Sequence, residues 1–391
     1  MTSPRELDLV LLGATGFTGG LTADYLAEHA PAGLRWAIAG RDRTRLEAVR
    51  DRLAADRPAL ADLPLVVADS SDPDSLAELA GATRAVVTTV GPYQQHGEPL
   101  VAACAAAGTD YLDLTGEPEF VDEMYVAHHA TAVASGARLV HACGFDSIPH
   151  DLGALFTVAQ LPSGVPITVR GVVRSNATFS GGTLHSAVNA MGRARESRKA
   201  AAARRRLESR AGGRSSRAVA GKPHRDPVLG YWLLPLPTID PAVVARSGAA
   251  LPGYGPDFRY SHYVGTKTLR FAVGGAVGVG GLVLAAQVPP LRRVILGRVD
   301  QGSGPNQERR DRSWFTADFV GEAAGEQVHT RVSGGDPGYT ETAKMLAESA
   351  LCLLLDDNPR TSGQVTTAQA MGENLLFRLR RAGMRFEVVS D

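Results

Sequence analysis

The first 150 residues alternate between short apolar segments and longer stretches of helix-forming composition, and this alternation restricts the fold more than any other feature of the sequence. The apolar segments are rich in β-branched residues, as strands are. They cover residues 7–12, 35–39, 65–68, 85–90, 111–114 and 137–143, with helices expected at about 17–30, 42–55, 74–80, 97–107 and 119–135. Strands joined by such helices form a parallel sheet covered on both faces. The sequence predicts a doubly wound α/β domain whose ligand crevice lies at the carboxyl ends of the strands.

A glycine-rich segment, VLLGATGFTGG, lies where the first strand passes into the first helix. Gly13 permits a tight turn, Gly16 lets a pyrophosphate approach the backbone, and Gly19 lets the helix pack closely on the strand. The phosphates would accept hydrogen bonds from the helix N-terminus. We therefore expect a Rossmann-type dinucleotide site formed by Gly13, Thr15, Gly16, Phe17, Thr18 and Gly19. The spacing is GxxGxxG rather than GxGxxG, and a plain strand-to-helix turn is the alternative.

The end of the second strand bears on which dinucleotide binds. Enzymes selective for NAD place an acidic residue here to bind the ribose 2′-OH. This sequence reads AGRDRTRLEAV and has Arg41 at that position. Because a guanidinium pairs bidentately with a 2′-phosphate, we expect NADPH as the cofactor. The adjacent Asp42 leaves NADH as the alternative, in which case Arg41 belongs to a solvated helix start.

Two further loops should line the same crevice. The segment ADSSD follows the third strand, and its Asp69 could reach the adenine amine. The segment TTVGPYQQHGEP follows the fourth, and its Gly91 and Pro92 turn the chain away beside the expected nicotinamide position. Tyr93 and His96 carry groups that can exchange protons and are the candidate catalytic residues. A tyrosine that only stacks on the cofactor is the alternative.

The segment GFDSIPHDLG, residues 144–153, follows the sixth strand at the border of the crevice. Asp146, Ser147 and His150 are candidate substrate-binding residues, since they lie near the expected nicotinamide. Alternatively, Asp146 and Ser147 cap a helix that begins near Pro149, and Asp151 complements its dipole. Both roles are compatible within one segment.

The pattern changes beyond residue 165. Alternating segments at 167–176, 268–273, 312–323 and 326–334 predict a second, α+β domain built on a mainly antiparallel sheet. Such a sheet typically carries a substrate site or the surface of a homodimer. The segment SGGTLHSAVNAM begins with small residues that would let a substrate approach, so Ser180 is a further candidate, with a plain helix start as the alternative.

Length and pattern together predict the domain organisation. A chain of 391 residues is longer than a single hydrophobic core usually stabilises. We expect a nucleotide-binding domain over 1–150, a substrate or dimerisation domain over 151–338, and a C-terminal helical segment over 339–391 that packs back onto the first domain.

Two segments of the second domain have unusual composition. Residues 193–226 hold twelve Lys or Arg against three acids and form either a solvated, partly mobile insertion or a surface for acidic acyl-carrier domains or anionic lipid. Interleaved aromatic residues are missing, which argues against nucleic acid. Residues 271–288 are eighteen residues without a charge, a borderline length for a membrane span. Their five glycines favour a segment that is buried or lies on a membrane.

Composition excludes several classes of protein. The 41 basic and 41 acidic residues give a formal net charge of zero, so there is no general attraction to nucleic acid. Cys104, Cys143 and Cys352 lie far apart with no CxxC or Cys/His cluster, which argues for a reducing compartment and against a metal site. The N-terminus has no signal-peptide pattern. We expect a cytoplasmic protein and leave open a peripheral contact at the inner face of the membrane.

Several segments together resemble one known family. They are LLGATGFTGG, AGRDRTRLEAV, TTVGPYQQHGEPLVAACAAAGTDYLDLTGE, HACGFDSIPHDLG, FSGGTLHSA and TAQAMGENLLFRLRRAGMRFEVV, which span most of the chain. In these the chain resembles the saccharopine dehydrogenase-like oxidoreductases, particularly the actinobacterial trans-acting enoyl reductases. The resemblance implies a nucleotide-binding domain followed by an α+β domain, an NADP-type cofactor, and reduction of a double bond in a polyketide chain whose synthase lacks a working reductase domain.

Three classes of function are compatible with these observations. We favour an NADPH-dependent oxidoreductase that reduces a C=C bond of a carrier-bound or lipid-like acyl intermediate, with a polyketide synthase as partner. There, hydride goes to the β-carbon, a donor near the thioester oxygen stabilises the enolate, and Tyr93, His96 or water protonates the α-carbon. The alternatives are a saccharopine-type imine or amino-acid reductase and a non-catalytic nucleotide-binding protein on lipid surfaces.

Overall fold

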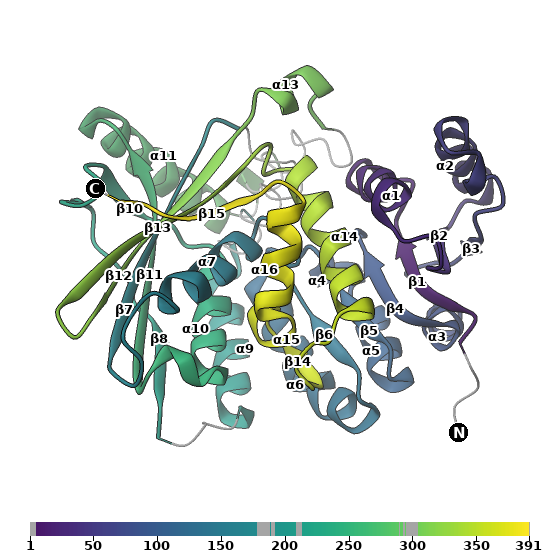
Figure 1. Ribbon diagram of the computed structural model, residues 1–391, viewed down its shortest axis with the longest axis horizontal. Coiled ribbons are helices and arrows are strands. Elements are labelled where there is room, and N and C mark those ends of the chain that lie inside the picture. Colours follow the sequence, from purple (N-terminus) through teal and green to yellow (C-terminus); the bar gives the residue numbers. More distant parts are fainter. Residues whose placement is uncertain are drawn as a thin grey trace.

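Two β-sheets lie side by side, with helices on both and between them (Figure 1). This computed structural model describes residues 5–177, 188, 192–208, 213–288, 290–291, 294 and 304–390. The first sheet has seven strands in the order β14-β6-β5-β4-β1-β2-β3, and every pairing is parallel. The strands are β1 (Leu7–Leu12), β2 (Trp36–Gly40), β3 (Leu65–Val67), β4 (Thr83–Thr88), β5 (Asp110–Leu112), β6 (Arg138–Val140) and β14 (Gly363–Val365). The predicted doubly wound α/β domain is confirmed.

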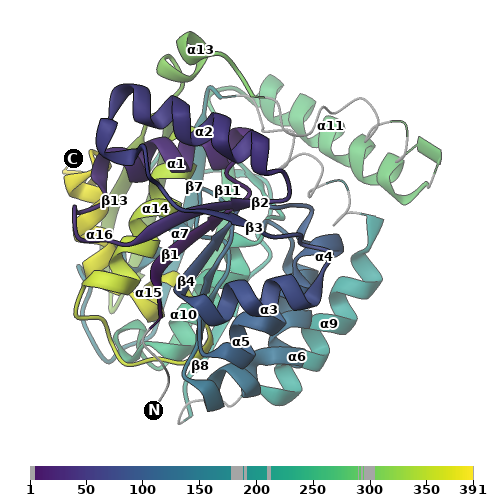
Figure 2. The ribbon, with the colours of Figure 1, turned by 90° about the vertical axis from the view of Figure 1, so that its right-hand side faces the viewer.

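Helices cover both faces of this sheet because alternate strand residues point to opposite sides. Leu9 and Leu11 pack into one apolar core with α1 and α2, while Val10 and Leu12 pack into another with α3, α5 and α6. Figure 2 shows these two groups of helices on either side of the strands. Their bounds are α1 (Phe17–His29), α2 (Arg43–Asp56), α3 (Pro73–Ala82), α5 (Glu98–Ala107) and α6 (Pro118–Ser135), and a short α4 (Tyr93–His96) precedes α5.

The second sheet is mixed and mainly antiparallel. Its order is β15-β13-β12-β7-β11-β10-β9, with β8 also paired to β11, and the two parallel pairings are β7 with β11 and β8 with β11. The strands are β7 (Ile167–Ser175), β8 (Ser215–Ala218), β9 (His224–Arg225), β10 (Trp232–Pro235), β11 (Asp257–Thr266), β12 (Phe315–Ala323), β13 (Glu326–Gly334) and β15 (Arg385–Val388). The helices of this half are α7 (Ile148–Val158), α9 (Ala194–Leu207), α10 (Asp240–Ala250), α11 (Leu269–Gln287) and α13 (Gln307–Asp311). The α+β character predicted for this half is confirmed.

Two local predictions were wrong. Residues 268–273 do not form a strand: β11 ends at Thr266 and α11 begins at Leu269. The second half of the basic segment is not only a loop, because β8 pairs with β11 and β9 pairs with β10. Strand β8 pairs with residues 257–260, which are distant in sequence, so no local pattern marks this strand.

The C-terminal part of the chain contributes to both sheets. Helix α14 (Thr340–Leu355) lies against α1, where the Tyr25 hydroxyl donates to Glu348 Oε1 at 2.8 Å. Strand β14 then extends the parallel sheet, and after α15 (Thr367–Ala370) and α16 (Gly372–Arg381), β15 extends the mixed sheet. The division into 1–150, 151–338 and 339–391 stays a prediction.

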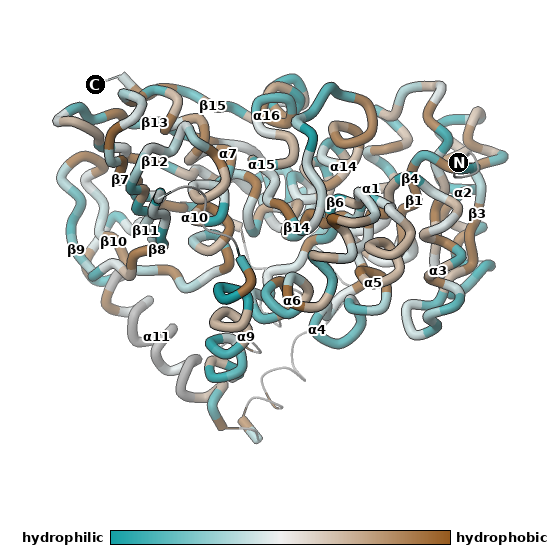
Figure 3. The backbone as a smooth tube through the Cα atoms, turned by 90° about the horizontal axis from the view of Figure 1, so that it is seen from below, coloured by the Kyte–Doolittle hydropathy of each residue, from teal (hydrophilic) through white to brown (hydrophobic). Residues whose placement is uncertain are grey.

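The basic segment begins with α9, which pairs part of its charge with α6. Arg193 makes a bidentate ion pair with Glu119, and Arg204 Nε lies 2.5 Å from Asp122 Oδ1. Other basic side chains of α9 stay exposed, and Figure 3 shows the helix as mostly hydrophilic. These exposed residues are Arg195, Arg198, Lys199, Arg205 and Arg206.

The apolar segment forms most of α11, which lies at the periphery of the molecule (Figures 1 and 2). The side chains of Leu269 and Val273 are half exposed, so the helix is not enclosed by the fold at these positions. In the described part of the chain, no helix has both the length and the apolar character that crossing a membrane requires.

Candidate functional site

The crevice of the parallel sheet lies between β1 and β4, where the strand order reverses. The loops that follow these two strands are in direct contact. Thr89 donates its backbone N–H to Leu12 O at 3.0 Å and its hydroxyl to Gly13 O at 3.2 Å. The glycine-rich segment therefore lies at the switch point, as a dinucleotide site requires.

Glycine stands at positions 13, 16 and 19 of this segment for three different physical reasons. Gly13 has φ +95°, in the left-handed region that favours glycine. A Cβ on Gly19 would lie 2.1 Å from Gly13 O, so the close approach of α1 to the loop excludes any side chain there. Gly16 has ordinary backbone angles, and a Cβ on it would meet only Gly13 O, at 3.4 Å. The fold itself does not need glycine at position 16, whereas a pyrophosphate approaching the backbone does.

The N-terminus of α1 offers its N–H groups to a ligand. Gly16 is the N-cap residue and has no side chain to cap the helix, and the first turn has no acidic residue. Such a terminus attracts anions. Thr15, Phe17 and Thr18 surround it, and the Phe17 ring is anchored 5.0 Å from the Tyr339 ring in an edge contact. This geometry fits the pyrophosphate of a dinucleotide.

Arg41 is exposed directly after β2 and makes no hydrogen bond or ion pair with the described residues. Its neighbours are engaged: Asp42 accepts the Arg45 N–H at 3.1 Å as the N-cap of α2, and Arg43 pairs with Glu47. Because the Asp42 carboxylate is used in this way, it is not poised for a ribose hydroxyl. A 2′-phosphate would therefore meet the guanidinium of Arg41.

Asp69 follows β3, the neighbour of β2, and is partly exposed. Its carboxylate accepts hydrogen bonds from the backbone N–H of Ser71 at 2.9 Å and from the Ser71 hydroxyl at 2.8 Å. These bonds, with a contribution from the charge of Arg41, lower the pKa of Asp69. The structure thus brings Asp69 and Arg41 near each other at the ends of β2 and β3.

The loop after β4 contains Gly91, Pro92 and the two candidate catalytic residues. Tyr93 is buried: its hydroxyl donates to Thr88 O at 3.0 Å and accepts from the Leu114 N–H at 3.2 Å. Burial raises the pKa of Tyr93 well above its usual value. Tyr93 thus ties the ends of β4 and β5 together. His96, at the end of α4, is exposed.

A buried histidine–aspartate pair at the ends of β5 and β6 was not foreseen as a unit. His141 Nδ1 lies 2.6 Å from Asp113 Oδ2, which also accepts the Tyr111 hydroxyl at 3.0 Å. The other oxygen of Asp113 accepts the N–H groups of Thr115 and Ala142. Asp113 therefore fixes the two loops that border the crevice. Its only sequence signal is a polar residue directly after an apolar run.

Asp146 lies six residues after the end of β6. Its side chain is partly exposed, and a Cβ on Gly116, in the loop after β5, would lie 3.2 Å from its Oδ2. Burial and the negative charge of Asp240 raise the pKa of Asp146 to about 7, against an opposing effect of His150. A carboxyl group with this pKa is about half protonated at pH 7, whereas an ordinary aspartate is ionised there.

Four buried side chains form a cluster next to Asp146: His150, Asp240, Tyr260 and His262. His150 Nδ1 lies 2.7 Å from Asp240 Oδ1, and His262 Nε2 lies 3.8 Å from Asp240 Oδ2. The Tyr260 hydroxyl and His262 Nδ1 are 3.1 Å apart. Burial lowers the pKa of His262 to about 3, so its ring is neutral. Asp240, Tyr260 and His262 were missed by sequence reasoning because they come from α10 and β11, far along the chain.

The other polar residues of GFDSIPHDLG are buried at the start of α7. Helix α7 begins at Ile148 with Ser147 at its N-cap position, but the Ser147 side chain makes no capping bond. Asp151 is fully buried and accepts the Thr367 hydroxyl at 2.7 Å and the Ala368 N–H at 2.8 Å, at the start of α15. His150 is buried behind Asp146. Ser180 lies outside the described residues.

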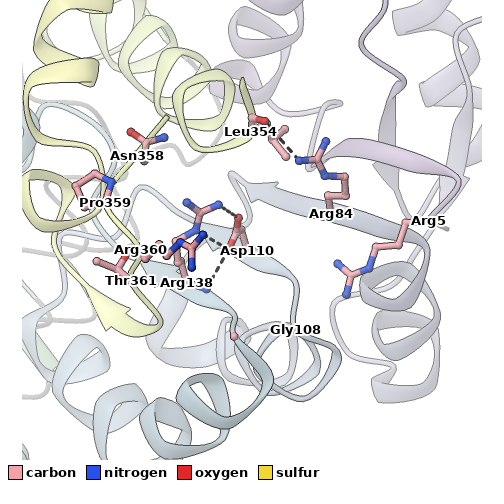
Figure 4. Close-up of a pocket in the computed structure, with 11 residues that line it drawn as sticks. Arg5, Arg84, Gly108, Asp110, Arg138, Leu354, Asn358, Pro359, Arg360 and Thr361 are labelled. Atoms are coloured by element: carbon pink, nitrogen blue, oxygen red, sulfur yellow. Dashed lines mark hydrogen bonds and ion pairs between the residues drawn. The ribbon is translucent and has the colours of Figure 1, made fainter. Parts of the chain in front are cut away.

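A cavity of about 400 Å³ lies at the opposite end of the parallel sheet, far from the glycine-rich loop. Figure 4 shows the residues around it, among them Arg5, Arg84 and Arg138. These guanidinium groups donate to carbonyl groups at helix ends: Arg5 to Ala107 O of α5, and Arg84 and Arg138 to Leu354 O and Leu353 O of α14. Arginines in this position satisfy the last carbonyls of a helix. The cavity is therefore explained by the fold.

The described residues contain no cluster of side chains suited to a metal ion. No group of three or more His, Cys, Asp or Glu in the described residues is arranged to hold a metal ion. The three cysteines are buried and free.

Comparison with known proteins gives three findings. The family model described as the saccharopine dehydrogenase NADP binding domain matches residues 9–140. A relative from Mycobacterium tuberculosis, named as a candidate trans-acting enoyl reductase, is 38% identical, and the trans-acting enoyl reductase of Mycobacterium ulcerans is 34% identical; each alignment covers 98% of both chains. Apo saccharopine dehydrogenase (L-Glu forming) from Saccharomyces cerevisiae superposes with a TM-score of 0.57 at 12% identity, over 98% of this chain and 100% of that one, a likeness in fold.

Proposed function

The chain belongs to the family of trans-acting enoyl reductases, with a saccharopine dehydrogenase-type NADP-binding domain, and we propose that it reduces the C=C bond of a 2-enoyl thioester. It is an NADP-dependent oxidoreductase, so the predictions of family and of NADPH as cofactor are confirmed. The observation that carries the cofactor's part in this proposal is the open approach above Gly16 at the N-terminus of α1. Arg41, exposed after β2, has no ion pair among the described residues and is available to a phosphate.

The chain's own residues would hold the cofactor in an extended pose across the crevice. The N–H groups of the first turn of α1 bind the pyrophosphate, and Arg41 pairs with the 2′-phosphate. Asp69 lies at the adenine end, and Gly91 and Pro92 turn the chain away where the nicotinamide lies. Bound NADPH supplies the hydride that adds to the β-carbon.

The substrate would enter between the two sheets. The loop after β6 lies at the carboxyl end of the parallel sheet; in it Asp146 is partly exposed whereas Ser147 is buried, so Asp146 is the residue that a substrate could reach. His96, on α4, is exposed as well. Of the two candidate proton donors named from the sequence, His96 alone presents an accessible side chain, since the Tyr93 hydroxyl is committed to two backbone groups.

The direct test uses purified protein with NADPH and a 2-enoyl thioester on an acyl-carrier domain. We expect NADPH fluorescence to fall and the acyl chain to gain two hydrogens by mass spectrometry. The saturated thioester is the control and should leave NADPH unchanged. Turnover only with an imine formed from an amino acid and an oxo acid would instead place the chain with saccharopine-type reductases, and no turnover at all would support a nucleotide-binding role.

We propose an acyl-carrier domain of a polyketide synthase as the partner, docked on the exposed basic face of α9. Carrier domains are acidic, and opposite charges steer association. The double variant Arg198→Glu, Arg205→Glu should bind the carrier domain more weakly. Its remaining affinity should also depend less on salt concentration. Arg385→Glu, on the exposed β15, is the matched control. Deleting the segment would be a poor test, because residues 215–218 belong to β8.

Two further contacts stay proposals. The exposed Leu269 and Val273 of α11, with Lys267 and Arg270 beside them, suit a peripheral contact with anionic lipid. Flotation with anionic and neutral vesicles tests this contact, and equal recovery with both would count against it. A homodimer through the mixed sheet is tested by sedimentation of the purified protein.

A further inference from the structure

A carboxyl group lies six residues after β6, at the end of the parallel sheet that carries the glycine-rich loop and where the proposed function places the substrate. Asp146 is the residue there, partly exposed, with the backbone of Gly116 close to its Oδ2 because glycine leaves room for the carboxyl. The preceding loops in the sheet, after β4 and β5, border the same space. A group in this position can meet a substrate that lies on the nicotinamide.

The surroundings of Asp146 favour its protonated form. The titratable groups that act on it are His150, in the first turn of α7, and Asp240 of α10; His262 of β11 lies beside Asp240 in turn. His150 is placed toward Asp240, with Nδ1 2.7 Å from Oδ1. Asp146 itself has no hydrogen-bonding partner among the described side chains that would hold its charged form.

We propose that Asp146 is the proton donor of the reduction, with Asp240 as a positioning residue that keeps it protonated. The proposal rests on the enoyl reductase function. As hydride adds to the β-carbon, the C=C π bond breaks and its electrons form an enolate. The enolate α-carbon then takes the proton of Asp146, so that a C–H bond forms, the O–H bond breaks and Asp146 is left as a carboxylate. Water from the crevice restores the proton.

Asp146 is better placed for this step than His96. The His96 ring is exposed at the end of a single turn, with no described contact that orders it. The Asp146 carboxyl is confined by Gly116 and by the start of α7. Positioned donors contribute about 10²–10⁴ to a rate, and confinement is what makes them effective.

The first test measures the titration of Asp146 without cofactor or substrate. Protein with ¹³C-labelled aspartate should show one side-chain carboxyl that titrates near pH 7. The signal should vanish in Asp146→Asn and persist in Asp122→Asn, another carboxyl with a raised pKa that lies on α6 beside Arg204. In Asp240→Asn the midpoint should move to lower pH, because a like charge is removed. A normal aspartate midpoint for Asp146 would overturn the proposal.

The second test measures single-turnover reduction of the enoyl thioester. Asp146→Asn should lower the rate about 10²- to 10⁴-fold with unchanged NADPH affinity, and Asp146→Glu should recover part of it. In the wild type the rate should fall as pH rises above about 7, because the donor must be protonated.

The outcomes separate this proposal from the one it rests on. If the wild type reduces the thioester and Asp146→Asn does so equally well with the same pH profile, Asp146 is not the donor; a loss confined to His96→Gln would assign the step to His96. If the wild type reduces no enoyl thioester, the enoyl reductase function fails, and the donor role of Asp146 fails with it.

Discussion

The named arginines at the two ends of the parallel sheet differ in whether the fold already uses their hydrogen-bond donors. At the amino end, Arg5, Arg84 and Arg138 line a cavity, but their guanidinium groups donate to helix carbonyls and to carboxylates of the fold. At the carboxyl end, Arg41 is exposed and unpaired among the described residues, and the terminus of α1 has no side-chain cap.

This difference distinguishes a cavity lined by structural side chains from a site whose groups are available to a ligand. A guanidinium that satisfies the end of a helix has few hydrogen bonds left for a ligand. An unpaired guanidinium, an uncapped helix N-terminus and a carboxyl with a raised pKa are costs to folding that a ligand or a reaction can use. We therefore expect the cofactor to bind at the carboxyl end of the sheet and not in the cavity at its amino end. The two ends should respond oppositely to mutation: stability should change at the amino end and binding at the carboxyl end.

The largest effect is expected for Gly16→Val. Its backbone angles suit valine, and a Cβ there would meet no atom closer than 3.4 Å, so the melting temperature should change little. It would fill the space of the pyrophosphate, and losing two charge-assisted hydrogen bonds costs about 3–6 kcal/mol of binding free energy. Calorimetric titration with NADPH measures the loss. Gly33→Val, at an exposed glycine with open space around it, is the control. Unchanged affinity in Gly16→Val would remove the pyrophosphate from this loop.

The second-largest effect is expected for Asp110→Ala, at the amino end of the parallel sheet. Asp110 Oδ1 accepts both the backbone N–H and the Nε–H of Arg138 at 3.0 Å, and Asp110→Ala leaves this guanidinium without its carboxylate. We expect the free energy of unfolding to fall by about 3 kcal/mol, at the low end for such pairs because both side chains are partly exposed. Urea denaturation measures it, with the exposed Asp62→Ala as control. A loss of NADPH affinity in the folded variant would contradict the separation of the two ends.

The smallest effect is expected for Arg41→Ala. The contact of a guanidinium with a phosphate contributes about 1.5–3 kcal/mol, and the lower end applies because Arg43 lies nearby. NADPH should bind about tenfold more weakly, whereas NADH, which has no 2′-phosphate, should bind as before. Equal losses for both nucleotides would make Arg41 structural, and no loss for either would place the 2′-phosphate elsewhere.

How far the sequence predicted the fold depends on the range of the interactions. The first six strands and the five helices between them were placed within three residues, because apolar runs and caps such as Asp42 are local signals. Strands β8, β9, β10, β11, β14 and β15 were not foreseen. All but β11 are only two to four residues long, and β8, β14 and β15 pair with strands that are distant in sequence.

The same rule holds for the site. The glycine-rich loop and Arg41 are read from one short segment and a known spacing. The Asp113–His141 pair and the Asp240–His262 cluster join residues about thirty and about twenty positions apart across different elements, so only the folded chain brings them together. The raised pKa of Asp146 likewise depends on burial and on Asp240, which sequence reasoning could not place beside it.

The most direct measurement is hydrogen–deuterium exchange with and without NADPH. It follows both ends of the sheet in one experiment and needs no substrate. We predict that NADPH slows exchange in peptides covering residues 13–20 and 40–45, while peptides covering 105–112 and 354–361 exchange as before. Protection around the arginine-lined cavity, or none at the glycine-rich loop, would contradict the assignment of the carboxyl end as the cofactor site.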